Sequence, residues 1–143
     1  AMSYLDKIRE LCDENGIELL LVRAPIEYGW HEQWDQNVEE YAAQYGLTYL
    51  NFNDYADEIG LDMSVDTYDA GLHLNIYGAE KLSVFFGQYL VDHYDLTDYR
   101  TVPEVAAEYE KDIQFYNDMR DAQLYEIETY GELVNYGANA IEN

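Results

Sequence analysis

A short, almost continuous apolar run, "IELLLVR" at Ile17–Arg23, is the feature that most constrains the fold of this chain. Runs of this kind are typical of strands buried on both faces, as in parallel sheets. A second strand is predicted at "LTYLNF", Leu47–Phe52, and the segment between the two has the apolar spacing of a helix over Trp34–Gly46. Another amphipathic helix over Ser3–Asn15 precedes the first strand. The order helix–strand–helix–strand predicts an α/β fold with parallel strands.

Local signals define the ends of these elements. Ser3 is placed to cap the first helix and Gly16 to end it. A short helical turn capped by Asn53 or Asp54 is expected after the second strand. In parallel α/β folds the functional loops lie at the carboxyl ends of the strands, which here means the loops that follow the two apolar runs.

The C-terminal half is predicted to be helical. Asn75 is well placed as the N-cap of one helix, whose apolar stripe comprises Leu82, Phe85, Phe86, Tyr89 and Leu90. Pro103 breaks the pattern, and from Glu104 to about Tyr136 one long or two shorter amphipathic helices are expected, with a stripe comprising Val105, Tyr109, Ile113, Tyr116, Met119, Leu124, Ile127 and Tyr130. We expect this stripe to pack on the body of the protein, with an intersubunit helix as the alternative, and residues 136–143 to fray.

Composition excludes several classes of function. The chain has 143 residues and is 48% hydrophobic, which is enough for one domain with a core. With 30 acidic and 7 basic residues its formal charge is −23, so it should repel nucleic acid and anionic membranes. It has no stretch of the length of a membrane span and no calcium-loop motif. We therefore expect no nucleic-acid partner, no membrane segment, no metal and no cofactor.

Cys12 is the single cysteine of the chain. It can form no internal disulfide, and no second thiol exists with which to build a zinc site. Because it lies on the apolar stripe of the first predicted helix, we expect a buried structural thiol.

The stretch "YDAGLHLNIYGAEKL", Tyr68–Leu82, carries the residues with the clearest chemistry. Asp69 lies four residues before His73, and Gly71 allows the backbone to turn between them. A histidine can exchange a proton near neutral pH, and a nearby carboxylate can orient it and stabilise its charged form. The residues alone leave two interpretations open, a catalytic pair or a helix-capping loop with a hydrogen-bonded histidine.

The segment "GLHLNIYGAEKL" resembles the last motif of the SGNH/GDSL hydrolase superfamily, Asp-x-x-His followed by Pro-Asn-x-x-Gly, with Leu74 in place of the frequent proline. It is most similar to bacterial cell-surface members that transfer or remove acyl groups. The resemblance covers residues 2 to about 94. It implies a partial three-layer flavodoxin-like α/β domain at 1–94, here its C-terminal part, and a helical extension at 95–143. It also implies an extracytoplasmic or cell-surface location and a small ester or an acylated glycan as the parent protein's substrate.

By this resemblance His73 would be the general base and Asp69 its orienting acid. The family spacing between acid and base is three residues, whereas it is four here. Either one residue is inserted in the loop or the partner is another acid, for which Asp66 is the next candidate. Arg23, His31 and Asn75 are the residues that could line the cleft. His93, near the end of a predicted helix, is expected to be a surface residue.

The nucleophile that such a hydrolase needs has no counterpart here. The family takes it from a Gly-Asp-Ser block that precedes the segment we see, whereas the serines present are Ser3, Ser64 and Ser83, none in such a context. The chain therefore reads as the C-terminal portion of a serine esterase or O-acyltransferase that is inactive alone. One alternative is a non-catalytic module that binds a partner. A second alternative, a small flavodoxin-like domain, is disfavoured because no Gly-rich phosphate loop follows either strand.

Self-association is the last expectation. Two strands alone leave an open sheet edge and apolar surface, and both recruit other chains. We therefore expect a homo-oligomer, formed through the sheet edge, the C-terminal helices or an exchanged element.

Overall fold

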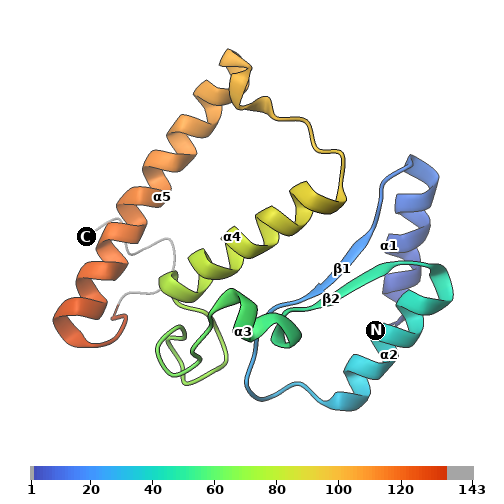
Figure 1. Cartoon of the computed structure of the whole chain (residues 1–143), viewed down its shortest axis with the longest axis horizontal. Helices are drawn as coiled ribbons and strands as arrows, with labels where there is room; N and C mark the ends of the chain where they lie inside the picture. The colour runs from blue at the N-terminus through green and yellow to red at the C-terminus, as the bar shows by residue number, and fades with distance from the viewer. Residues whose placement is uncertain (1, 135–143) are drawn as a thin grey trace. The chain divides into compact units, whose positions relative to one another are not determined.

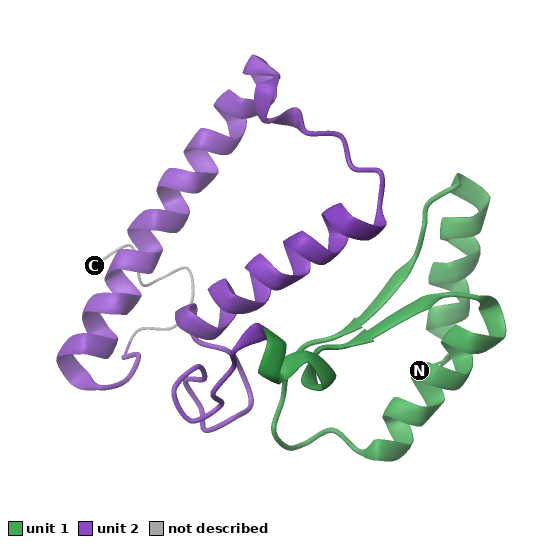
Figure 2. Cartoon of the chain, viewed as in Figure 1, with its two compact units in different colours: residues 1–58 green, residues 59–143 purple. Residues whose placement is uncertain are grey.

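The structure, a computed structural model, describes residues 2–134 (Figure 1). The chain is a mixed α/β protein, mostly helical, with a two-stranded parallel sheet among the described residues. It divides into two compact units, residues 1–58 and 59–143 (Figure 2). The boundary between the units falls within helix α3 (Ala56–Ile59).

The first unit contains the predicted βαβ arrangement. Helix α1 (Met2–Asn15) leads into β1 (Leu20–Arg23), helix α2 (Glu32–Tyr45) follows, and β2 (Thr48–Asn51) pairs with β1 in parallel. Both strands are shorter than the apolar runs that predicted them, because a strand extends only as far as its partner pairs. The register runs from the pair Leu20–Thr48 to the pair Arg23–Asn51.

Strand β1 is not buried on both faces, and that expectation was wrong. None of its four residues is fully buried, and 49% of Val22 is exposed. The side chain of Arg23 contacts Asp35 of α2, so Val22, its neighbour along the strand, points to the opposite face. Within the described residues β1 also has a paired strand on one edge only.

Three local predictions need correction. Ser3 does not cap α1, because the helix already begins at Met2 and so Ser3 lies inside it. The turn after β2, a 3-10 helix η1 (Phe52–Tyr55), is capped by Asn51, whose side chain accepts from the Asn53 amide. Cys12 is a free thiol of intermediate exposure and not a buried one, because the neighbouring apolar residues of α1 are themselves largely exposed.

The second unit is helical. Asn75 caps α4 (Ile76–His93), as predicted, and its side chain accepts from the amides of Tyr77 and Gly78. A 3-10 turn η2 (Tyr99–Thr101) precedes α5 (Pro103–Tyr130), which is one continuous helix. The fraying expected for residues 136–143 falls outside the described residues.

Helices α4 and α5 meet near the start of α4 and diverge from there (Figure 1). Arg120 donates to Glu80 at 2.5 Å, and the Tyr116 hydroxyl donates to the same carboxylate at 3.1 Å. The hydrogen bond from Arg120 is the main reason that the pKa of Glu80 is lowered. The predicted stripe of α5 therefore packs in its C-terminal half, where Met119, Leu124 and Ile127 are half-buried.

The buried apolar side chains are few, and they comprise Tyr41, Ala42, Leu50, Phe52, Ile59, Ile76 and Leu133. Within residues 2–134 no helix has both the length and the apolar character needed to cross a bilayer.

Candidate acid–base site

The loop before α4 is built on a buried carboxylate. Asp66, with 2% of its surface exposed, accepts from the Asp62 amide at 2.8 Å and from the Lys81 ammonium at 2.6 Å. Its backbone carbonyl accepts from the Asn75 amide at 2.8 Å. A buried charge is tolerated only when it is paired and hydrogen-bonded, and these contacts meet that need. Asp66 thus ties both ends of the loop to α4.

Asn75 completes this frame. Its side-chain amide donates to the carbonyl of Val65 at 2.6 Å and to that of Thr67 at 3.3 Å, while its side-chain oxygen caps α4. Gly78 lies directly against the same loop: a Cβ at this position would meet the Asp66 carbonyl oxygen at 2.4 Å. The Asn-x-x-Gly spacing therefore has a local physical reason, because the asparagine holds the loop and the glycine leaves it room.

Within this frame the structure brings Asp69 and His73 together. Asp69 Oδ2 lies 2.5 Å from Nδ1 of His73, and Asp69 Oδ1 accepts from the backbone amides of Leu72 at 3.1 Å and His73 at 2.7 Å. The acid–base spacing of four is accommodated by two residues with positive φ, Ala70 at 58° and Gly71 at 107°. The acid therefore closes a tight loop around the histidine with both of its oxygens.

The electrostatics of the pair favour an ionised acid. Burial raises the pKa of Asp69, but hydrogen bonds from the side chain and backbone of His73 outweigh it, so the net pKa is lowered. An ionised Asp69 can only accept, so Nδ1 of His73 carries a hydrogen, and Nε2 of the neutral ring keeps its lone pair. The His73 side chain is 65% exposed, and within the described part of the chain Nε2 has no hydrogen-bond partner. The Tyr68 ring stacks on the imidazole at a centroid distance of 5.6 Å.

Asp66, the alternative acid, is not in contact with His73. Its carboxylate is engaged by Lys81 and by the Asp62 amide. The geometry therefore pairs His73 with Asp69 and leaves Asp66 to hold the loop.

Arg23 and His31 belong to the first unit, whereas Asn75 belongs to the second. Arg23 donates to Asp35 at 2.8 Å, and the same carboxylate accepts from the Tyr49 hydroxyl and, at 3.1 Å, from Asn51. Burial, and then the bond to Asp35, raises the pKa of Tyr49. Asp35 is thus the centre of a polar cluster at the carboxyl ends of β1 and β2, and it is not among the site residues predicted from the sequence. The sequence feature that could have identified Asp35 is its position as an acid in the first turn of the helix that follows β1.

The two tryptophans of the chain lie beside this cluster. The Arg23 guanidinium lies 5.4 Å from the ring centroid of Trp30, and Trp30 meets Trp34 edge to face at 5.5 Å. His31 packs against Trp34 at 4.7 Å and makes no side-chain cap of α2.

None of the three serines is placed as a nucleophile beside His73. Ser64 donates its hydroxyl to Asp62 at 2.6 Å, Ser83 lies within α4 and Ser3 within α1. No hydrogen bond joins a serine to His73 in residues 2–134. The third histidine, His93, is exposed at the end of α4 and bonds the Tyr89 carbonyl through Nδ1 at 2.9 Å.

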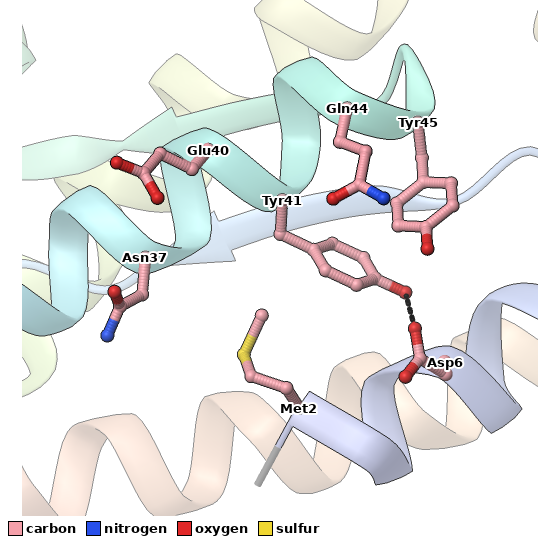
Figure 3. Close-up of a pocket in the computed structure, with 7 residues that line it drawn as sticks. All are labelled: Met2, Asp6, Asn37, Glu40, Tyr41, Gln44 and Tyr45. Carbon is pink, nitrogen blue, oxygen red and sulfur yellow. Dashed lines mark hydrogen bonds between the residues drawn. The ribbon is translucent and has the colours of Figure 1, made fainter.

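A pocket of about 440 Å³ lies between α1 and α2 (Figure 3). The Tyr41 hydroxyl donates to Asp6 across it at 2.9 Å, and the rest of its lining comprises Met2, Asn37, Glu40, Gln44 and Tyr45. Within residues 2–134 its lining contains no histidine, serine or cysteine. Among the described residues no three His, Cys, Asp or Glu side chains converge as a metal site would require.

No protein-family model, no curated protein and no solved structure matches this chain.

Proposed function

We propose that Asp69 and His73 are the acid–base half of a serine-type acyl-transfer site, and that this chain is the C-terminal portion of an SGNH-type esterase or O-acyltransferase. The observation that carries the proposal is the pair itself: Nδ1 of His73 is held at 2.5 Å by Asp69, and Nε2 is exposed and unbonded within the described residues. A general base needs an oriented ring with one free nitrogen that a hydroxyl can reach.

In this mechanism a serine from the rest of the protein attacks the carbonyl carbon of an ester. His73 Nε2 takes the proton of the serine hydroxyl as the new C–O bond forms, and then gives it to the leaving alcohol as the old C–O bond breaks. Asp69 stays ionised, keeps the hydrogen on Nδ1 and stabilises the imidazolium. Water completes hydrolysis of the acyl-serine, whereas an acceptor hydroxyl completes transfer. The ester class proposed is a small ester or an acylated glycan.

The same proposal includes the fold. The two parallel strands and their crossover helix would be the last part of a larger three-layer domain. Another strand of that domain would pair with the edge of β1 that has no partner among the described residues. Helices packed on the open face of such a sheet would cover Val22, which is half exposed in this chain.

Chemical modification tests the pair directly. Diethylpyrocarbonate acylates an imidazole nitrogen that carries a lone pair, so Nε2 of His73 should react readily. In Asp69→Asn the new amide can donate to Nδ1, which places the hydrogen on Nε2 and should slow the reaction several-fold. His93, whose Nδ1 bonds a backbone carbonyl, is the internal control and should be unchanged in the variant. Peptide mapping by mass spectrometry measures both rates.

An unchanged His73 rate in Asp69→Asn would contradict the proposal. The missing nucleophile gives a second test, because the chain should hydrolyse p-nitrophenyl acetate no faster than its His73→Ala variant. Turnover well above that variant and abolished by a fluorophosphonate would show that the chain has its own serine nucleophile.

A further inference from the structure

The N-terminal half of α5 lines an apolar groove. Together with η2 it encloses a hollow with a volume of about 700 Å³. The apolar lining comes from Tyr99 in η2 and from Val105, Tyr109 and Ile113 in α5. Ile113 is 56% exposed, and Tyr109 is more exposed still. Large apolar side chains gathered in one exposed hollow are typical of a binding surface.

The groove continues a helix face that is already used for packing. Steps of four and three residues place Tyr109, Ile113 and Tyr116 on one side of α5. At Tyr116, and one turn later at Arg120, this face contacts Glu80 of α4. Towards its N-terminus α5 diverges from α4 (Figure 1). Tyr109 and Ile113 are more than half exposed, so no α-helix among the described residues covers them. The N-terminal half of this face therefore resembles a helix-packing surface on which no second α-helix is packed among the described residues.

Charge defines what could fill it. Helix α5 has eight acidic and two basic residues, a formal charge of −6. At 100° per residue, Glu108 and Asp112 lie on one side of the apolar face and Glu110 on the other. One of the two basic residues, Lys111, is already paired with Glu108 at 3.2 Å. An apolar seam with acidic flanks attracts a basic partner and repels a second copy of itself.

From this we infer that the groove binds a basic amphipathic helix of a partner protein. Apolar side chains of that helix would contact Val105, Tyr109 and Ile113, and its lysines or arginines would face the acidic flanks on both sides. This interaction goes beyond the acid–base chemistry and does not depend on Asp69 or His73.

The test uses a synthetic amphipathic helix, LKKLLKLLKKLLKL, labelled with fluorescein, and measures its anisotropy with the whole chain in 0.15 M salt. We expect saturable binding that weakens with added salt, because exposed charges are screened. Ile113→Ala removes apolar contact without changing charge and should weaken binding roughly tenfold, as expected for a central interface residue. Tyr109→Ala is the second variant of the groove.

Phe115→Ala is the matched control. Phe115 is as exposed as Ile113, at 55%, but lies on another side of the same helix. It should leave binding unchanged, whereas equal weakening by both variants would mean non-specific attraction to an acidic protein and would overturn the inference. So would wild-type affinity in Ile113→Ala, or equal binding of a peptide with glutamate in place of lysine. A dimer that Ile113→Ala dissociates, without peptide binding, would assign the groove to self-association instead.

Discussion

Gly78→Ala is the sharpest test of how the loop and α4 hold the His73 site. The added Cβ would lie 2.4 Å from the Asp66 carbonyl oxygen and 3.0 Å from Cβ of Asp66 and from a methyl of Leu74. A relaxed carbon–oxygen contact is about 3.3 Å or longer, so the helix and the loop must separate by roughly 1 Å. That carbonyl also accepts the Asn75 amide, so the movement would strain a hydrogen bond in the same frame.

The expected cost follows from two opposing effects. Overpacking a tight contact costs about 1–3 kcal/mol, and here the nearest atom is backbone, so the upper part of that range applies. Alanine in place of glycine in a helix returns up to about 1 kcal/mol. We expect a net loss of about 2 kcal/mol. With a urea m-value of about 2 kcal/mol/M, the midpoint of unfolding should fall by about 1 M.

Gly87→Ala in the same helix is the matched control. Nothing lies within 4 Å of a Cβ added there, so only the helix propensity remains and the midpoint should rise by about 0.5 M. Urea unfolding followed by far-UV circular dichroism measures both variants. Amide spectra should show the Gly78→Ala change concentrated in the loop that carries Asp69 and His73. If the two variants shift the midpoint in the same direction, the close contact between α4 and the loop is not as described.

Three further outcomes are expected. Asn75→Ala should lower the free energy of unfolding by about 2 kcal/mol, because it removes the helix cap and the bonds to two loop carbonyls. Asn75→Ser should lower it less, because the hydroxyl can still cap α4, and equal losses in urea unfolding would contradict this. The pKa of Tyr49 is raised above the unfolded value of 10, so its contribution to stability is complete below pH 10 and is lost as the pH rises further. Tyr49→Phe should therefore make the urea midpoint fall less steeply at alkaline pH, and an equal slope in both proteins would refute this. The free edge of β1 and the exposed Val22 favour self-association that increases with salt, and light scattering after size exclusion at low and high salt would exclude it by showing a 16.7 kDa monomer in both.

Local patterns were sufficient for the parts of the fold that depend on neighbours in sequence. The apolar spacing predicted α2 and the βαβ order, and the short polar side chain of Asn75 predicted the start of α4, because a cap and a helix stripe are decided within one or two turns. The exposure of β1 depends on what covers the other face of the sheet, which the apolar run itself does not contain.

The same distinction applies to the candidate site. Asp69 and His73 are four residues apart, so a turn with positive φ could be anticipated from Gly71. The Asp66–Lys81 pair spans fifteen residues, and the bonds of Asp35 to Arg23, Tyr49 and Asn51 span twelve to sixteen. Contacts at this separation depend on how strands and helices pack, and no spacing rule identifies them.

The bonds between Asp69 and His73 have a consequence for which substitutions their geometry tolerates. One oxygen of the acid orients the imidazole and the other accepts two backbone amides, all within five residues of chain. The bonds that order the pair are thus local, whereas the loop that carries the pair is held from outside by the Asp66–Lys81 pair and by Asn75. Substitutions elsewhere in the chain should therefore leave the Asp69–His73 geometry intact as long as these two anchors remain.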